Sequence, residues 1–194
     1  MKMKPEWKAE IPAKLSEWYG KDEYYLYVKL LIHAGLRPSE SAALTWGDIS
    51  QEPIEINGEM FGTINVPIIT MKTMDGITDT LPKFESDIRT ALVSWHLIEE
   101  ICSLKNREKD DERIFRSPPY RDEYTRRWRR VKKDFSLPTE MKWFNLRKYY
   151  IDFLVRSGFG RADVLKQIGY RDSISMPDMF FDDYRQYVYK TYQE

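Results

Sequence analysis

Apolar residues in the N-terminal quarter of the chain recur every three or four positions among lysines and glutamates. This spacing is the period of an α-helix with one buried face. The pattern predicts helices over residues 1–20, 22–34 and 38–46, the first ending near Gly20. In the second segment, one helical face is formed by Tyr27, Leu30, Leu31 and Ala34.

Residues 52–84 are instead rich in β-branched side chains. The run consists of Ile54, Ile56, Ile64, Val66, Ile68, Ile69 and Thr70. Two dipeptides typical of hairpin turns interrupt it, Asn57-Gly58 and Asp75-Gly76. We therefore expect three short antiparallel strands, at about 52–56, 61–71 and 77–82.

Helical spacing returns after residue 84. It predicts a helix over 86–105, with an inward stripe made of Ile88, Ala91, Leu92 and Trp95. A second helix is expected over 121–134, with the apolar line Tyr124, Trp128 and Val131. The sequence thus predicts an α+β fold, a mostly helical domain with a small three-stranded antiparallel sheet.

Composition narrows the class of protein. A chain of 194 residues with 42% hydrophobic residues suggests one globular domain over residues 1–194. The single cysteine, Cys102, excludes a disulfide framework and a cysteine-based zinc site, and we expect it to be buried. His33 and His96 do not have metal-ligand spacing, so we expect no metal or cofactor. Without a signal peptide or a long apolar run, we expect a soluble intracellular protein.

Charge is segregated along the chain although the net charge is zero. Residues 51–100 carry 3 basic and 9 acidic side chains, whereas residues 121–150 carry 10 basic and 4 acidic ones. Such segregation can create a local phosphate-binding face, or it can reflect two solvated helix faces of opposite sign. The candidates for sequence-independent contacts with a nucleic-acid backbone are Arg126, Arg127, Arg129, Arg130, Lys132 and Lys133.

The segment 34–48 combines several helix-boundary signals. Gly35 can end one helix and Pro38 can begin the next. Glu40 then falls in the first turn, where a carboxylate suits the positive end of the helix dipole. Arg37 is placed at a helix N-terminus, where it can meet an anion. The alternative is an ordinary surface arginine between two helices.

This segment resembles the first arginine motif of the tyrosine recombinases, the phage-integrase family. The family pattern is Thr-Gly-Leu-Arg-x-Ser-Glu, a few apolar residues, and then Leu-x-Trp-x-Asp. The matching positions are Gly35, Leu36, Arg37, Ser39, Glu40, Leu44, Trp46 and Asp48.

Three further motifs follow in the family's order, so that the resemblance covers residues 12–190. The expected hairpin after residue 68 resembles the one that carries the family's lysine, here Lys72. Leu146 and Arg147 match the His-x-Leu-Arg motif. Residues 168–170, which end in Tyr170, take the place of Leu-Gly-His or Leu-Gly-Trp.

The resemblance implies a catalytic-domain fold and an enzyme that cleaves and rejoins double-stranded DNA through a covalent 3′-phosphotyrosine. It implies that Arg37 and Arg147 clamp the phosphate, Lys72 is the general acid and Tyr170 is an auxiliary hydrogen-bond donor. Such a reaction needs no nucleotide or metal, and we expect self-association on DNA. The source would be a virus or a mobile element.

The chain departs from the family at three functional positions. Tyr170 stands where the family has histidine or tryptophan, and its hydroxyl can still donate one hydrogen bond. Phe144 replaces the first histidine of the His-x-x-Arg motif and can neither shuttle a proton nor donate a hydrogen bond. The nucleophilic tyrosine is expected about nine residues after Tyr170, where Met179 stands, and the first tyrosine is Tyr184.

Three explanations remain open for the missing tyrosine. An insertion can move the nucleophile to Tyr184, or Phe180 or Phe181 can mark a replaced nucleophile. Alternatively, the fold is kept only for binding, which would make the chain a catalytically degenerate DNA-binding or regulatory module. The family's N-terminal DNA-clamping domain has no counterpart in the sequence, and we expect the tail at about 180–194 to dock in trans. A helical protein-interaction domain without a DNA role is the third class.

Overall fold

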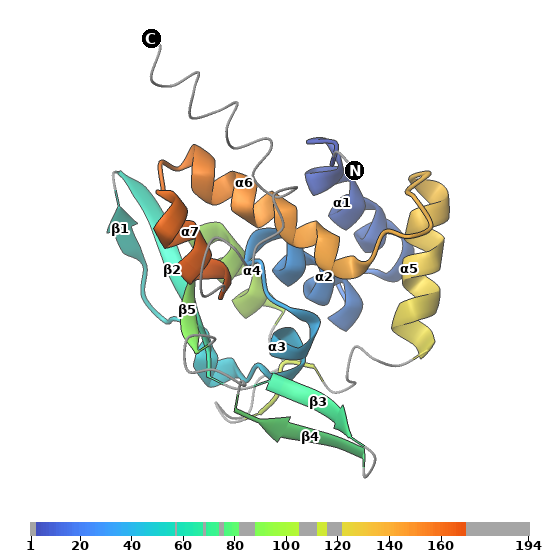
Figure 1. The fold of residues 1–194 in the computed structure, drawn as a ribbon, viewed down its shortest axis with the longest axis horizontal. Coiled ribbons are helices and arrows are strands. Elements are labelled where there is room, and N and C mark those ends of the chain that lie inside the picture. The colour runs from blue at the N-terminus through green and yellow to red at the C-terminus, as the bar shows by residue number, and fades with distance from the viewer. Residues whose placement is uncertain are drawn as a thin grey trace.

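The structure is a computed structural model, and it describes residues 3–56, 58–67, 69–73, 76–81, 88–104, 112–115 and 122–169. All structural statements below concern these residues. Helices surround a central helix, a small sheet lies to one side, and a separate hairpin projects from the body (Figure 1). None of the described helices is long and apolar enough to span a membrane.

The two N-terminal helices confirm the predictions for that region. Helix α1 covers Trp7–Tyr19, and Gly20 follows it with a positive φ of 68°. Helix α2 covers Glu23–His33 and is buried along most of its length. The Asp22 side chain caps α2, because it accepts the main-chain N–H groups of Tyr24 and Tyr25 at 3.1 and 3.0 Å.

Helix α3 covers Pro38–Ala43, which is shorter than the predicted 38–46. Leu44 adopts ψ 136° and ends the helix, and a 3-10 turn, η1, follows at Trp46–Asp48. The predicted roles of Gly35 and Pro38 are confirmed. Gly35 follows the α2 C-cap with φ 59°, and Pro38 occupies the first turn of α3.

The three-stranded antiparallel sheet is present, but the prediction of its third strand is wrong. Its order is β1 (Ile54–Ile56), β2 (Glu59–Val66) and β5 (Arg89–Ser94). The predicted strand 61–71 is split, because Pro67 has no N–H to donate to a ladder. Strands β3 (Ile69–Thr73) and β4 (Gly76–Thr80) pair antiparallel as a separate two-stranded sheet, and Asp75 of the predicted turn lies outside the described residues.

The helix predicted over 86–105 is wrong in its first half. Residues 89–94 form β5, and only Trp95–Ser103 is helical, as α4. Both faces of β5 are largely buried, so its sequence does not alternate between apolar and polar residues as a half-exposed strand would. Ile88, a member of the predicted inward stripe, is 47% exposed. Cys102 on α4 is half-buried rather than fully buried.

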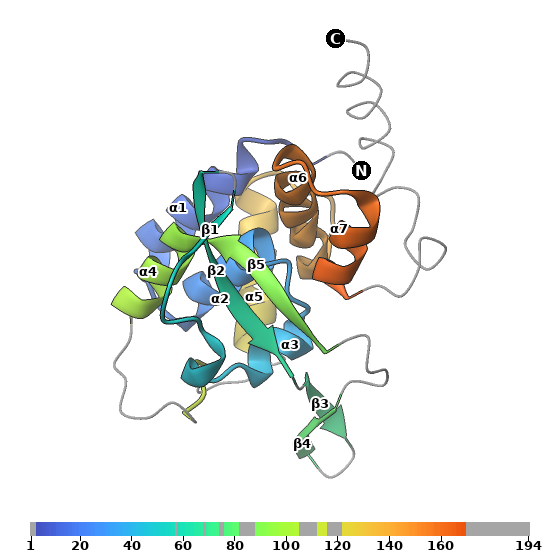
Figure 2. The ribbon, with the colours of Figure 1, turned by 90° about the vertical axis from the view of Figure 1, so that its left-hand side faces the viewer.

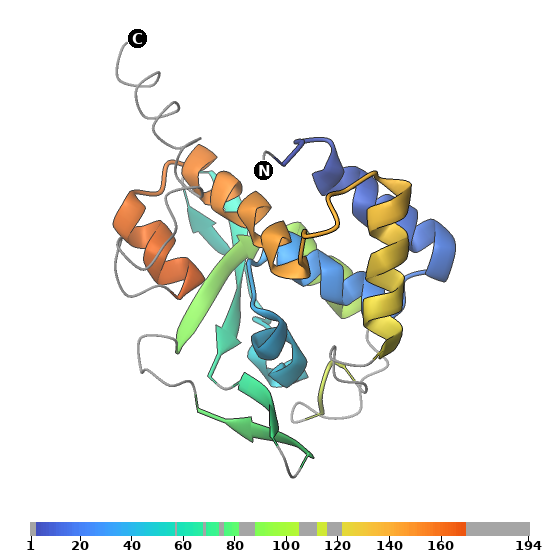
Figure 3. The same cartoon turned by 45° about the vertical axis from the view of Figure 1, so that its right-hand side comes forward.

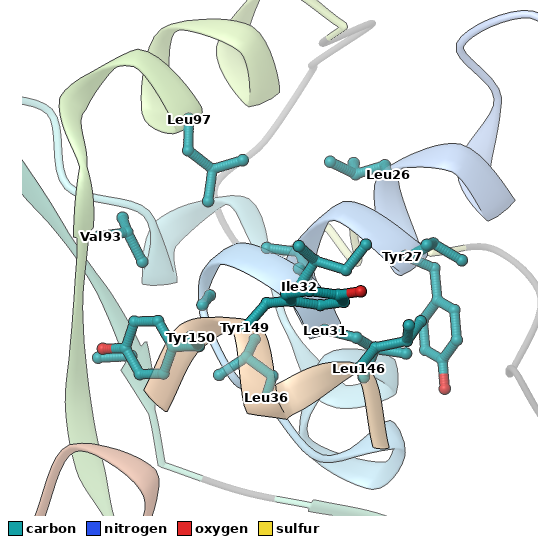
Figure 4. Close-up of a cluster of buried hydrophobic side chains, with 14 of the residues drawn as sticks. Leu26, Tyr27, Leu31, Ile32, Leu36, Val93, Leu97, Leu146, Tyr149 and Tyr150 are labelled. Carbon is teal, nitrogen blue, oxygen red and sulfur yellow. The ribbon is translucent and has the colours of Figure 1, made fainter. Parts of the chain in front are cut away.

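The C-terminal half supplies the remaining helices: α5 (Asp122–Asp134), the 3-10 turn η3 (Trp143–Arg147), α6 (Lys148–Arg156) and α7 (Arg161–Ile168). The predicted apolar line of α5 is confirmed, since Tyr124, Trp128 and Val131 are buried. Helix α6 packs against α2. The buried cluster there contains Leu31 of α2, Tyr149 and Tyr150 of α6, Leu36 from the segment after α2 and Leu146 from η3 (Figure 4).

The sheet connects this helical core to α7. Helices α4 and α7 both pack on β5, and Figure 2 shows them on opposite sides of this strand. The β3–β4 hairpin lies beside α3, away from α7 (Figure 3). As a result, the N-terminus of α3, the start of β5, the end of η3 and the end of α7 meet in one region.

Candidate functional site

Three arginines from three different elements surround one buried glutamate. Arg37 precedes α3, Arg89 begins β5 and Arg147 ends η3. Glu40, in the first turn of α3, has 0% exposure. We call these four residues the arginine cluster. The structure thus brings together the two predicted phosphate clamps, Arg37 and Arg147.

Glu40 accepts four hydrogen bonds. Arg89 holds it bidentately, with Nη1 2.6 Å from Oε1 and Nη2 2.8 Å from Oε2. Arg37 donates Nη1 to Oε1 at 2.8 Å and its main-chain N–H to Oε2 at 2.5 Å. Because an ionised carboxylate has about four acceptor positions, this set saturates Glu40.

The pKa of Glu40 reflects these partners. Burial alone would raise the pKa, but the hydrogen bonds and charge of Arg89, followed by the charges of Arg147 and Arg37, lower it to about 2. Glu40 is therefore ionised at neutral pH. With its acceptor positions filled, its role is to hold the arginines in place.

The same three arginines bind three consecutive carbonyl oxygens at the C-terminal end of α7. The Nε of Arg89 donates to the carbonyl of Gln167 at 2.8 Å. Arg147 Nη2 donates to Ile168 at 2.7 Å, and Arg37 Nη2 donates to Gly169 at 2.5 Å. These bonds satisfy carbonyls that have no partner within the helix. Consecutive carbonyls lie close together, so the guanidinium groups of Arg37 and Arg147 are neighbours.

Two glycines make this close approach possible. Gly169 has φ 69°, and a Cβ there would lie 3.1 Å from Nη1 of Arg89 and 3.3 Å from Nη1 of Arg37. Gly35 has no side chain, and its carbonyl accepts a hydrogen bond from Arg147 Nε at 2.6 Å. Both glycines belong to the motifs that carried the sequence resemblance.

The cluster is accessible to solvent mainly through one of its members. The Arg37 side chain is 29% exposed, whereas that of Arg89 is 3% exposed and Arg147 is 6% exposed. The four residues together carry a net charge of +2, in a setting of low dielectric that strengthens attraction to an anion. Chemically, the arrangement suits a phosphate that approaches Arg37 and has Arg147 beside it.

Phe144 lies three residues before Arg147 on η3. Residues separated by three positions on a 3-10 helix lie on the same side. The Phe144 residue is 42% exposed, although it is a large apolar side chain. The position that holds histidine in the resembling motif therefore carries an exposed apolar ring, which offers no hydrogen-bond donor.

The other predicted catalytic residues are only partly described. Lys72 lies on β3, whose backbone runs beside α3, and its side chain is outside the described part of the structure. Tyr170, Phe180, Phe181 and Tyr184 also lie outside the described residues, as does the tail at 180–194. Their roles stay predictions.

The predicted DNA-contacting residues of α5 fall into two groups. Arg127 is tied into the fold, because it binds Asp22 and Glu123 and its guanidinium lies 4.3 Å from the Tyr19 ring centroid. Lys132 is half-buried and donates to the carbonyl of Thr139 at 2.5 Å. The exposed members of the set are Arg126, Arg129, Arg130 and Lys133.

A shallow hollow of about 330 Å³ lies beside this helix, lined by Tyr19, Glu123, Arg126, Arg127 and Arg130. Arg130 also lies 4.5 Å from the Trp18 ring centroid. Cations held over aromatic rings keep their charge at the surface while their stems pack on apolar side chains. The α5 surface thus combines fixed cations with exposed ones.

Arg89 is the site residue that sequence reasoning misses. It falls within the segment wrongly predicted as a helix, and it matches no quoted motif. The signal available in the sequence was an isolated arginine at the start of an apolar run. A charged residue at the start of a buried strand needs a buried partner of opposite charge, so such an arginine points to an ion pair inside the fold.

Among the described residues, no group of three or more histidine, cysteine, aspartate or glutamate side chains could hold a metal ion. No protein-family model matches the chain, and no curated protein sequence matches it. Its similarity to known proteins is therefore seen in the structure.

Solved structures of integrases and recombinases share the architecture. The Tn1549 transposon integrase in complex with circular intermediate DNA has a TM-score of 0.71 at 18% identity, over 98% of this chain and 67% of that chain. XerA recombinase has a TM-score of 0.60 at 16% identity, over 100% and 65%. XerH recombinase bound to palindromic difH substrate has a TM-score of 0.60 at 16% identity, over 99% and 53%.

The chain thus spans between about half and two thirds of these proteins' lengths. At such identities, the likeness establishes the fold and leaves the activity to be argued from the site. From its layered helices, its three-stranded sheet and these structural matches, the chain has the catalytic-domain fold of the tyrosine recombinases.

Proposed function

We propose that this chain binds double-stranded DNA and breaks and rejoins one strand through a covalent 3′-phosphotyrosine. The observation that carries the proposal is the arginine cluster, in which Arg37 and Arg147 bind adjacent carbonyls and Arg37 is partly exposed to solvent. The neighbouring structures support a role on DNA, since they include a transposon integrase and a recombinase in complex with DNA. The transposon integrase also favours a mobile element as the setting of the reaction.

The proposed reaction requires a nucleophile, a general acid and groups that stabilise the phosphate charge. The tyrosine hydroxyl gives up its proton to water and its oxygen attacks the phosphorus, the bond from phosphorus to the 5′ oxygen breaks, and the leaving 5′ oxygen takes up a proton. Arg37 and Arg147 stabilise the charge that develops on the non-bridging oxygens. We assign the proton to Lys72, the auxiliary hydrogen bond to Tyr170 and the attack to Tyr184. Rejoining reverses the step when a 5′-hydroxyl attacks the phosphotyrosine.

The exposed cations of α5 are proposed to bind the DNA backbone on either side of the cleaved phosphate. Arg126, Arg129, Arg130 and Lys133 offer charges that carry no sequence information by themselves. We further propose that copies of the chain associate on DNA.

Covalent trapping tests the enzymatic proposal. Nicked duplexes of randomised sequence would be incubated with the chain, denatured, and searched for DNA strands attached to protein. At a nick, the short leaving strand diffuses away, so a 3′-phosphotyrosine adduct accumulates. We expect an adduct that maps to Tyr184 by mass spectrometry and disappears in Tyr184→Phe. Bound DNA without any adduct would contradict cleavage.

One observation favours a second function, a DNA-binding or regulatory module without cleavage. Phe144 offers an exposed ring where the resembling motif has a proton-carrying histidine. The same assay separates the two functions. If DNA binds without an adduct, tyrosine would be introduced by Phe180→Tyr and Phe181→Tyr. A gain of adduct would identify a replaced nucleophile, and continued absence would favour the binding module.

A further inference from the structure

We infer that Arg89 is a positioning residue for the phosphate site, which holds Glu40 and, through Glu40, fixes the direction of Arg37. The inference rests on the proposed function and adds a residue to it. Arg89 lies in β5, far in sequence from both predicted clamps, and no part of the sequence resemblance includes it.

Every nitrogen of the Arg89 guanidinium is engaged inside the protein. Nη1 and Nη2 bind the two oxygens of Glu40, and Nε binds the carbonyl of Gln167. The side chain is only 3% exposed. Arg89 therefore does not contact DNA itself, and its effect must pass through the groups that it holds.

The first of these groups is Glu40, which Arg37 also binds. A carboxylate shared by two arginines fixes both of them, since its oxygens are saturated only when the Arg89 fork and the Nη1 and main-chain N–H of Arg37 are all in place. If Arg89 is removed, Glu40 keeps its charge but has lost its bidentate partner. The carboxylate then competes with the phosphate for Arg37, and the net charge of the cluster falls from +2 to +1.

The second group is the last turn of α7. Gln167 is held twice: Arg89 binds its carbonyl, and its side-chain Oε1 accepts the main-chain N–H of Leu92 at 2.8 Å. The hydroxyl of Tyr150, which donates its proton to the carbonyl of Leu92 at 2.6 Å, lies 3.2 Å from the same Oε1. Strand β5 therefore sets the position of the next two carbonyls, which bind Arg147 and Arg37.

The test compares Arg89→Met and Arg89→Lys with the original chain. Adduct formation would be timed at saturating DNA on two matched nicked duplexes, one with a normal phosphate and one with a methylphosphonate at the cleaved position. A methylphosphonate lacks one charged oxygen and depends less on an arginine clamp. Arg156→Met is the matched control, because Arg156 is a surface arginine that pairs with Asp152.

We expect Arg89→Met to slow cleavage of the phosphate about 100-fold, with less than tenfold slowing on the methylphosphonate. Arg89→Lys keeps one charge but cannot span both oxygens of Glu40, so its rate of phosphate cleavage should lie between those of Arg89→Met and the original chain. The double variant Arg37→Gln/Arg89→Met should be no more than about threefold slower than Arg37→Gln alone. Circular dichroism identifies any variant that fails to fold, and Arg89→Lys then provides the comparison.

Three results would overturn the inference: cleavage by Arg89→Met within threefold of the original chain, an equal loss on both substrates, or losses that multiply in the double variant. If the original chain binds DNA without forming an adduct, the enzymatic proposal fails, and the same variants are compared by fluorescence anisotropy on the nicked duplex. Affinity losses of Arg37→Gln and Arg89→Met that do not multiply would still support positioning, and multiplying losses would refute it. A chain that binds no DNA refutes both proposals.

Discussion

At the scale of single residues, Gly35 shows how the backbone is adapted to the site. Its φ is 59°, and a Cβ would lie 2.2 Å from Cδ1 of Tyr150. Tyr150 is fully buried and donates its hydroxyl to the carbonyl of Leu92 at 2.6 Å, so its ring cannot move aside easily. The carbonyl of Gly35 meanwhile holds Arg147. Glycine at this position therefore serves both the packing of Tyr150 and the placement of Arg147.

Replacing this glycine separates steric overlap from backbone strain. Gly58 has φ 81°, and nothing lies within 4 Å of the place that a Cβ would take, so Gly58→Ala should cost only the strain, about 1 kcal/mol. Gly35→Ala adds overpacking and should cost about 3 kcal/mol or more. Urea unfolding of both variants measures the difference. Equal losses would show that Tyr150 moves aside without cost.

Glu40 predicts a specific dependence of stability on pH. Its pKa in the folded chain is lowered to about 2, from the ordinary glutamate value of 4.5. A lowered pKa stabilises the fold above the unfolded value and loses that contribution as pH falls through 4.5 toward 2. The contribution is on the order of 3 kcal/mol.

Glu40→Gln tests this linkage. The variant should be less stable at pH 7, because Arg89 is left buried without a carboxylate. Its free energy of unfolding should also fall less steeply than that of the original chain between pH 5 and pH 2. Chemical denaturation across this range measures both slopes, and parallel slopes would contradict the assignment.

Single residues also show which parts of the site could be predicted from the sequence. Gly35, Arg37, Glu40 and Arg147 could be found because they stand in recognisable local patterns. Arg89 could not, because its function depends on Glu40, which lies 49 positions away in the chain and adjoins it only in the folded structure. Local spacing carries no information about such a contact.

At the scale of elements, the same distinction explains which segments could be predicted. Helices α1, α2 and α5 are amphipathic or capped, and their signals are local. Strand β5 is buried on both faces, and Ile88, Ala91, Leu92 and Trp95 imitate a helical stripe by spacing alone. A short apolar run of this kind is ambiguous until its neighbours are known. The predicted sheet therefore has the right number of strands and one wrong member.

Helix α5 allows its two groups of cations to be tested against each other. Arg129 is exposed, and we expect Arg129→Gln to weaken DNA binding and to lower the slope of log K against log salt by about 0.9. Arg127 is held by Asp22, Glu123 and Tyr19, so Arg127→Gln should instead lower the free energy of unfolding by about 1–2 kcal/mol. Anisotropy titrations and urea unfolding of both variants would check these expectations. A loss of stability in Arg129→Gln together with a loss of DNA binding in Arg127→Gln would contradict the division of the α5 cations into two groups.

At the scale of the whole molecule, positive charge is concentrated locally, so the proposed attraction to DNA would be local rather than general. The net charge is zero, yet the arginine cluster carries +2 and α5 adds exposed cations. If about four phosphates are neutralised, affinity for duplex DNA should fall about 10²-fold between 50 and 200 mM salt. A titration series at fixed pH measures the slope, and binding insensitive to salt would contradict a backbone-binding surface.

Arg147→Lys is the variant that best tests whether the arginine cluster binds the phosphate at which the strand is cut. Lysine keeps the charge but cannot form the planar fork. Adduct formation would be timed at saturating nicked duplex, with affinity measured separately and with Arg129→Gln as the control for backbone binding. We predict a rate of adduct formation about 100-fold lower in Arg147→Lys, with DNA affinity within threefold of the original chain. Arg129→Gln should instead weaken affinity and leave the rate at saturating DNA unchanged. An unchanged rate in a folded Arg147→Lys chain would contradict binding of that phosphate by the arginine cluster.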